Sequence, residues 1–199
     1  MSIFVSDLDD VVVDFVGSVC KYTSTDHAMT AQYEEFTSFE FVDVWGMSLE
    51  ECDKLLDQYF LSPNFLTIEP RTDAIIGLNS LKFSGHTLYA LTSRHDLIRE
   101  HTALWLPNKF PGVFADILFS SNAHTSRATG RSKADILNEI KADYFAEDNL
   151  AYAVDAAQVV KYVYLFRHPW NRSGTPLPSN IIEVDTWYEV TAHIRSIEK

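Results

Sequence analysis

Short apolar runs alternate with longer amphipathic stretches along most of the chain. The runs have the length and the β-branched and aromatic content of buried strands, which we predict at 3–6, 87–93, 116–120, 144–148, 162–166 and 181–184. Between the later runs, apolar residues recur at helical spacing and predict helices over 72–83, 95–106, 132–142, 149–159 and 186–197. Strands that alternate with helices form a parallel sheet covered on both faces, so we predict an α/β fold.

The stretch between the first strand and the helix at 72–83 has a different pattern. Aromatic residues are interleaved with acids there, and no segment shows the alternation of a half-buried strand. A helix over 47–61 begins with Ser48 as N-cap and Glu51 as its capping-box partner, and Pro63 is expected to end it. We therefore predict a core domain, residues 1–15 and 73–199, that carries a small helical cap at 16–72.

Charge and composition narrow the class of protein. The 199 residues carry a net charge of −12, and this argues against a surface that binds nucleic acid, because such surfaces are usually basic. No apolar run approaches the roughly 18 residues of a membrane span, and the N-terminus lacks the pattern of a signal peptide. Cys20 and Cys52 fit no metal-binding spacing, so we expect reduced cysteines in a cytoplasmic protein.

Two carboxylates, Asp7 and Asp9, directly follow the first strand. Burying them requires a compensating positive charge, such as Mg²⁺, a lysine or a helix N-terminus. The alternative is a solvated acidic turn. Polar residues also follow the strands at 87–93 and 144–148, and in a parallel sheet these carboxyl ends form one edge where ligands bind. These further residues are Thr92, Ser93, Glu147 and Asp148.

These residue types can together perform phosphoryl transfer. One carboxylate attacks phosphorus, and a second protonates the leaving oxygen and then activates water. A hydroxyl and a lysine hold the phosphoryl oxygens, while Mg²⁺ offsets the repulsion between the anions and needs oxygen ligands. In that order, the residues with suitable chemistry are Asp7, Asp9, Thr92, Lys133 and Asp148.

The ordered set resembles the four motifs of the haloacid dehalogenase-like (HAD) phosphatases, and the resemblance covers nearly the whole chain. The segments that carry it are Asp7-Leu8-Asp9-Asp10-Val11, Leu91-Thr92-Ser93, Lys133 and Glu147-Asp148. The resemblance implies a three-layer Rossmann-like sandwich with a helical cap inserted after the first strand. It also implies Asp7 as nucleophile, Asp9 as general acid and base, and Thr92, Ser93 and Lys133 as phosphate ligands.

The same resemblance implies a Mg²⁺ site. Its ligands would be the Asp7 side chain, the Asp9 main-chain carbonyl and the acids Glu147 and Asp148. The fourth motif is Glu-Asp here rather than Asp-Asp. We expect Asp148 to be the more direct ligand, because the longer Glu147 side chain would reach the metal through water.

A narrower resemblance links the chain to bacterial or phage members of the 5'(3')-deoxyribonucleotidase group. It rests on residues 163–172, 184–187 and 12–15. It implies a nucleoside monophosphate as substrate; a sugar phosphate, another metabolite or a catalytically idle binding protein are the alternatives. Asp10 departs from the glycine that is common in this group. The sequence leaves open whether the chain forms a homodimer.

Four further residues are candidates for contact with the substrate. The aromatic side chains of Phe15, Phe41 and Trp45 could stack on a base, although such residues more often form the core of a cap. Arg94 is close enough to Thr92 in sequence to reach the substrate. Apart from that candidacy, we expect Arg94, like His95, to take an exposed position on the following helix.

Overall fold

The computed structural model describes residues 1–27, 29, 31–121 and 130–198. Its centre is a parallel sheet with strand order β3-β2-β1-β4-β5-β6. The strands are β1 (Ile3–Ser6), β2 (Thr87–Thr92), β3 (Phe114–Phe119), β4 (Tyr144–Glu147), β5 (Tyr162–Phe166) and β6 (Ile181–Val184). Because β1 lies between β2 and β4, the loops that follow these three strands meet at the point where the strand order reverses.

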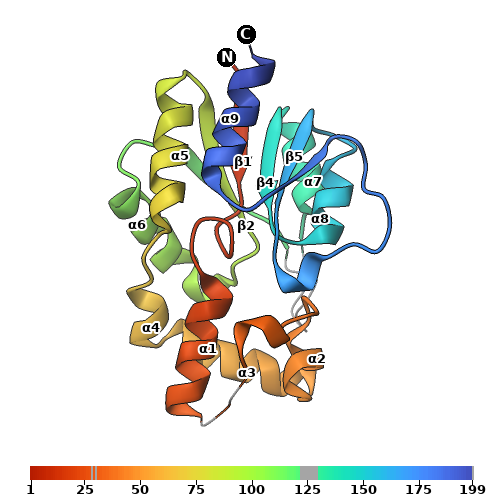
Figure 1. Cartoon of the computed structure of the whole chain (residues 1–199). Helices are drawn as coiled ribbons and strands as arrows, with labels where there is room; N and C mark the ends of the chain where they lie inside the picture. The colour runs from red at the N-terminus through yellow and green to blue at the C-terminus, as the bar shows by residue number, and fades with distance from the viewer. Residues whose placement is uncertain (28, 30, 122–129, 199) are drawn as a thin grey trace.

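Helices cover both faces of the sheet (Figure 1). On one face, Phe4 of β1 packs in a cluster with residues of α5 (Thr72–Phe83), α6 (Arg99–Lys109) and α9 (Trp187–Ile197). On the other, Val5 packs with α7 (Lys133–Glu139) and α8 (Leu150–Ala156). Neighbouring residues of a strand point to opposite faces, which explains why both are fully buried. The predicted three-layer α/β sandwich is confirmed.

The residues between β1 and α5 form short helices beyond the carboxyl end of β1, in the lower part of Figure 1. They are α1 (Phe15–Asp26), a 3-10 turn η1 (Tyr33–Glu35), α2 (Phe41–Trp45), α3 (Leu49–Phe60) and α4 (Pro63–Leu66). Ser48 caps α3 and Glu51 completes the capping box, as predicted. Pro63 does not end α3 directly: that helix stops at Phe60, and Pro63 begins α4, where its missing N–H has no helical partner to lose.

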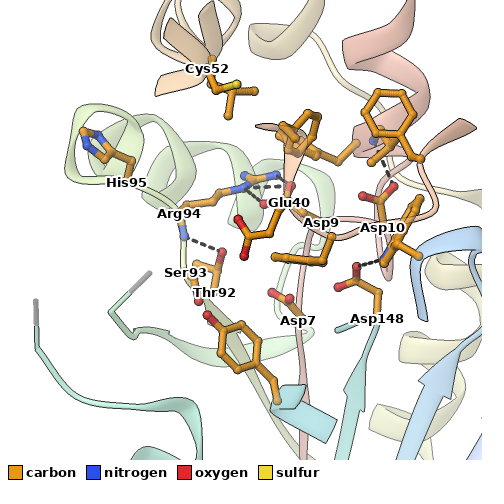
Figure 2. Close-up of a pocket in the computed structure, with 18 of the residues that line it drawn as sticks. Asp7, Asp9, Asp10, Glu40, Cys52, Thr92, Ser93, Arg94, His95 and Asp148 are labelled. Carbon is orange, nitrogen blue, oxygen red and sulfur yellow. Dashed lines mark hydrogen bonds and ion pairs between the residues drawn. The ribbon is translucent and has the colours of Figure 1, made fainter. Parts of the chain in front are cut away.

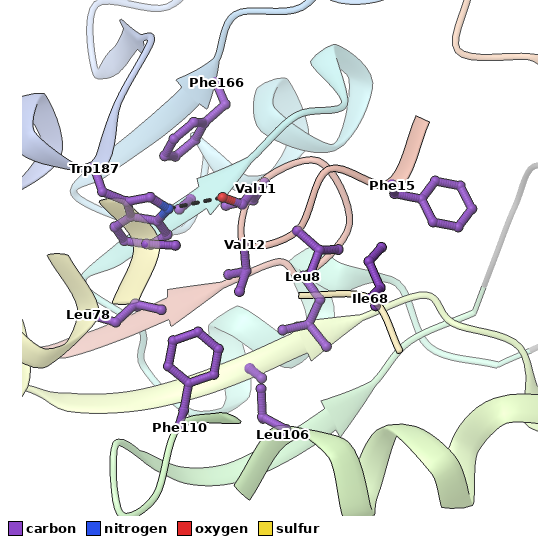
Figure 3. Close-up of a cluster of buried hydrophobic side chains, with 14 of the residues drawn as sticks. Leu8, Val11, Val12, Phe15, Ile68, Leu78, Leu106, Phe110, Phe166 and Trp187 are labelled. Carbon is purple, nitrogen blue, oxygen red and sulfur yellow. Dashed lines mark hydrogen bonds between the residues drawn. The ribbon is translucent and has the colours of Figure 1, made fainter. Parts of the chain in front are cut away.

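Buried side chains anchor the loop that follows β1. Leu8, Val11 and Val12 are fully buried, and the indole N–H of Trp187 donates to the Val11 carbonyl at 2.9 Å (Figure 3). Trp187 also packs tightly against α5, because a Cβ on Gly77 would lie 2.7 Å from the Trp187 Cβ. The loop that carries the acids of the first motif therefore rests on a rigid core.

The helix that follows β2 also differs from its prediction. A 3-10 turn, η2 (Asp96–Ile98), precedes α6, which continues to Lys109 instead of ending before Pro107. Pro107 removes only one backbone hydrogen bond in the last turn, so the helix accommodates it. Residues 122–129 of the polar stretch after β3 lie outside the described residues.

Candidate active site

A pocket opens between the carboxyl ends of β1, β2 and β4 and the helices that follow β1 (Figure 2). Its sheet side is polar, whereas its opposite wall is mostly apolar and comes from α1, α2, α3 and the segment before α2. With the exception of Trp45, the candidates from the sequence line this pocket. They are Asp7, Asp9, Thr92, Ser93, Lys133, Glu147, Asp148, Phe15, Phe41 and Arg94.

Lys133 connects two of the carboxylates. It is the first residue of α7, whose N-cap is Ser132, and its side chain is only 3% exposed. The ammonium group donates to Asp7 Oδ2 at 2.6 Å and to Glu147 Oε2 at 2.8 Å. A lysine gains nothing from the dipole at a helix N-terminus, so these two carboxylates account for its burial.

Glu147 is held by the protein through both carboxylate oxygens. Its second oxygen, Oε1, accepts the backbone N–H groups of Asp148 and Asn149 at 3.1 and 3.0 Å. Its side chain has no exposed surface. This arrangement suits a residue that fixes Lys133, and it supports the expectation that Asp148 is the more direct metal ligand.

Burial dominates the acid–base properties of the cluster. It raises the pKa of Asp7 to about 7, because lost hydration and the nearby Glu147 and Asp9 carboxylates outweigh the attraction of Lys133. Burial and the Glu147 charge likewise raise the pKa of Asp148 well above its ordinary value. The pKa of Lys133 is raised by Asp7 and Glu147, although burial itself opposes this. The site therefore holds more negative charge than one ammonium compensates.

The residues fit a hard divalent cation. Carboxylate oxygens of Asp7, Glu147 and Asp148 lie within 4.8 Å of one another, and the three residues are buried. Oxygen donors of this kind suit Mg²⁺, and a dication would relieve the repulsion that raises the pKa values of Asp7 and Asp148.

Arg94 occupies a place that its sequence context does not predict. It lies before η2 rather than on an exposed helix, and its side chain is 1% exposed. Its guanidinium group contacts both oxygens of Asp9, at 2.7 Å to Oδ1 and 3.0 Å to Oδ2. It also donates to Thr102 Oγ1 at 3.3 Å and lies over the rings of Phe65 and Trp105. Arg94 therefore fixes Asp9 in the lining of the pocket, and the expectation of an exposed arginine is wrong.

Thr92 and Ser93 lie at the end of β2, beside Asp7 and Arg94 (Figure 2). The Thr92 hydroxyl accepts the backbone N–H of Arg94 at 3.1 Å, and this shapes the turn. The Ser93 hydroxyl lies 2.9 Å from the Ser120 hydroxyl at the end of β3. Both residues line the pocket that Asp7 also lines.

The aromatic candidates divide between the pocket lining and the packed interior of the helices that follow β1. Phe15 and Phe41 line the pocket and pack edge-to-face against each other. Trp45 packs against Phe41 at a centroid distance of 4.7 Å and against Phe36, two rings that line the pocket, but it is not itself among the lining residues. The local pattern could not separate these roles, because all three residues sit in one aromatic cluster whose packing decides which ring faces the pocket.

Sequence reasoning gave no functional role to the residues that follow β5. The His168 ring lies 2.8 Å, through Nε2, from the Asp10 carbonyl, and it also bonds the Tyr33 hydroxyl. Trp170 donates to Asp148 Oδ2 at 2.9 Å. Asp10 itself adopts a left-handed conformation, with φ of 56°, and accepts the Val16 N–H at 3.1 Å, so it shapes the loop after β1. Asp14 caps α1.

A comparison with models of protein families matches nearly the whole chain. Residues 1–194 match the family described as 5' nucleotidase, deoxy (pyrimidine), cytosolic type C protein. No sequence of a curated protein gives a significant match.

Solved structures with the same fold share little sequence with this chain. A haloacid dehalogenase-like hydrolase from Streptococcus pneumoniae is 15% identical, with a TM-score of 0.68 over 98% of both chains. A predicted phosphatase from Clostridium acetobutylicum is also 15% identical, with a TM-score of 0.68 over 98% of this chain and 99% of its own. The L-2-haloacid dehalogenase of Xanthobacter autotrophicus is 12% identical, with a TM-score of 0.63 over 99% of both chains. These likenesses show a HAD-like fold.

Proposed function

Since the chain belongs to the family of 5' nucleotidases described as deoxy (pyrimidine), cytosolic type C, and is a HAD-type phosphoric monoester hydrolase, we propose that it hydrolyses nucleoside monophosphates with the help of Mg²⁺. The reaction would pass through an aspartyl-phosphate on Asp7, and the preferred substrates would be 5'- or 3'-(deoxy)ribonucleotides. The observation that carries the proposal is the buried contact of Lys133 with Asp7 and Glu147, at the edge of a pocket with an apolar wall.

In the first step, a carboxylate oxygen of Asp7 attacks the phosphorus atom and the ester P–O bond breaks. Asp9 gives its proton to the leaving oxygen, so the product departs as an alcohol. Lys133, with the hydroxyls of Thr92 and Ser93, holds the phosphoryl oxygens as negative charge develops on them. The product of this step is the nucleoside, with the phosphoryl group bound to Asp7.

In the second step, Asp9 takes a proton from water, whose oxygen attacks the phosphorus. The bond between phosphorus and the Asp7 oxygen breaks, and inorganic phosphate leaves. Both oxygens of Asp9 contact Arg94, so we propose that Arg94 keeps the Asp9 carboxylate in the pocket, where one oxygen exchanges this contact for the leaving oxygen or the water when a proton is transferred.

The acids of the site would hold Mg²⁺. Asp7, Asp148 and the main-chain carbonyl of Asp9 are the proposed direct ligands, and Glu147 would contribute through water. When bound, the ion would neutralise charge on the phosphoryl group and on Asp7, so that one anion can approach the other.

The apolar wall of the pocket supports a substrate with a flat, apolar part. Phe15, Phe41 and Phe60 belong to this wall and face the polar side across the pocket. A nucleobase can pack on such rings, whereas a small sugar phosphate would leave them in contact with water. We propose that residues 16–72 act as the cap that selects the substrate and that 1–15 with 73–199 form the catalytic core.

A substrate panel tests the proposal. Phosphate release would be measured from deoxyribo- and ribonucleoside monophosphates, from sugar phosphates and from phosphoglycolate, with Mg²⁺ and with a chelator. We expect hydrolysis of nucleotides that requires Mg²⁺. Preference for a sugar phosphate would contradict the substrate assignment, and binding of nucleotide without turnover would favour an idle binding protein.

Two further points belong to the proposal. Both cysteines are free thiols, which supports a location in the reducing cytoplasm. Among the described residues no helix has the length and apolar character needed to cross a bilayer.

A further inference from the structure

Asp148 is held from two directions by the segment that follows β5. This segment is His168 and the 3-10 turn η3 (Pro169–Asn171). The indole N–H of Trp170 donates to Asp148 Oδ2 at 2.9 Å, the contact drawn at Asp148 in Figure 2. The Asn171 side chain donates to the Asp148 main-chain carbonyl at 2.6 Å and to the Phe166 carbonyl at 2.6 Å. The side chain and the backbone of Asp148 are thus fixed by neighbouring residues of one turn.

The Trp170 ring is itself fixed. It stacks on the His168 ring with a centroid distance of 4.4 Å and an interplanar angle of 0°. The Tyr33 ring packs edge-on against it at 5.5 Å. The His168 ring contacts the carbonyl of Asp10 at 2.8 Å, in the loop that carries the acids of the first motif. The position of the indole N–H is therefore set by the first loop and by a residue of the cap.

A hydrogen bond to a carboxylate in a buried place orients the whole group. Asp148 is 4% exposed, so water offers little competition for its oxygens. With Oδ2 bound to Trp170, the plane of the carboxylate is fixed, and so is the direction of Oδ1. Groups that orient a metal ligand in this way commonly change metal affinity by about 10- to 100-fold when they are removed.

We propose that Trp170 is a positioning residue for the metal: its indole N–H holds Asp148 Oδ2 so that the carboxylate is ready to bind a divalent cation. This inference rests on the proposed function, because it requires Asp148 to be a Mg²⁺ ligand. Trp170 also lines the pocket, but the role proposed here is to orient Asp148 and not to contact the substrate.

The test is calorimetric titration of the full chain with Mg²⁺, in the absence of substrate. Trp170→Phe keeps a six-membered aromatic ring but removes the N–H, and we expect its Kd for Mg²⁺ to rise about 10- to 100-fold. Trp170→His keeps an N–H at nearly the same distance from Cβ, since both donors belong to a five-membered ring. Its affinity should lie closer to that of the wild type. Asp148→Asn should abolish most of the binding.

Trp187→Phe is the matched control. It removes an indole N–H from a bond of the same 2.9 Å length, but the acceptor is the Val11 carbonyl rather than a carboxylate. We expect it to lower the melting temperature without a comparable change in Mg²⁺ affinity. Phosphate release gives a second readout: the kcat of Trp170→Phe should approach the wild-type value at saturating Mg²⁺.

Different results would overturn the role of Trp170 and the metal site itself. Wild-type affinity in Trp170→Phe, with loss of binding in Asp148→Asn, would overturn the role of Trp170 and leave the metal site standing. A Trp170→His variant as weak as Trp170→Phe would also overturn that role. Equal binding by Asp148→Asn and wild type would overturn the metal site and, with it, this inference.

Discussion

The ammonium group of Lys133 lies 2.6 Å from Asp7 Oδ2, although the two residues are 126 positions apart in the chain. Asp7 follows the central strand β1, and Lys133 begins α7 on one face of the sheet. Glu147, at the end of the neighbouring strand β4, accepts from the same ammonium group at 2.8 Å. The fold thus joins three separate segments around one buried positive charge.

Removal of that charge should impair both stability and activity. Lys133→Met leaves two buried carboxylates without their partner, and the loss of one member of a buried pair typically costs about 3–5 kcal/mol. Loss of a donor to the phosphoryl oxygens should lower kcat by at least about 100-fold. Urea unfolding and phosphate release measure the two effects.

Lys161→Met is the control for this variant. Lys161 pairs with Asp143 at 2.7 Å, but its side chain is 65% exposed. We expect a change of less than about 1 kcal/mol and unchanged turnover. Similar losses in both variants would contradict a special role for Lys133.

Arg94→Met should displace Asp9. The guanidinium group contacts both Asp9 oxygens, so without it the carboxylate can rotate away from the pocket. A misplaced proton donor lowers kcat by up to about 100-fold, while Mg²⁺ binding should persist. The exposed Arg99, which pairs with Asp96, supplies the control variant Arg99→Met. Full turnover by Arg94→Met would show that Asp9 needs no such support.

Stability should depend on pH through His168. Burial lowers the pKa of His168 from its ordinary value of 6.5 to about 4, and the contact with the Asp10 carbonyl only partly opposes this. Well above pH 6.5 the His168 ring is neutral in both the folded and the unfolded protein. Its contribution to the free energy of unfolding is then complete. As the pH falls from 6.5 to 4, the unfolded chain takes up a proton that the folded chain does not, so stability decreases by about 3 kcal/mol in total.

Urea unfolding at several pH values isolates this contribution when His168→Gln is measured beside the wild type. Glutamine keeps an N–H that can face the Asp10 carbonyl but does not titrate, so the difference between the two proteins should shrink as the pH falls from 6.5 to 4. A difference that stays constant over this range would show that His168 titrates normally in the folded protein.

Gly77 should tolerate no larger residue. A Cβ at this position would lie 2.7 Å from the Trp187 Cβ, so Gly77→Ala forces α5 and α9 apart. We expect a loss of about 1–3 kcal/mol, larger than the gain of less than about 1 kcal/mol that alanine brings to a helix. Gly174→Ala is the control, because a Cβ there would meet no atom of the described residues within 4 Å. Equal melting temperatures for the two variants would contradict the packing account.

Most of the sheet and its polar edge could be predicted because they depend on local patterns. Each of β1, β2 and β4 is a short apolar run, and Asp7, Thr92 and Asp148 lie at or just after the ends of these runs. In a parallel sheet such positions converge whatever the remaining packing is. The domain boundaries and residue roles drawn from the sequence stay predictions.

The places of the other site residues depend on contacts that the local sequence pattern does not reveal. Arg94 looked like an exposed residue because its neighbours give no sign of Asp9, which lies 85 positions earlier. Trp170 contacts an acid 22 positions away, and the sequence pattern of a loop carries no record of that pairing. Trp45 and Phe41 are four positions apart on one short helix, and only the packing of the helices that follow β1 shows which of them lines the pocket.

The central claim is that Asp7 is the nucleophile. The most direct test uses a nucleoside monophosphate with a radiolabelled phosphate group. The enzyme is quenched with acid during turnover, and the labelled peptide is then identified by peptide mapping. We expect the label on the peptide that contains Asp7, and neither label nor turnover in Asp7→Asn. Phosphate release by Asp7→Asn at the wild-type rate would contradict the account.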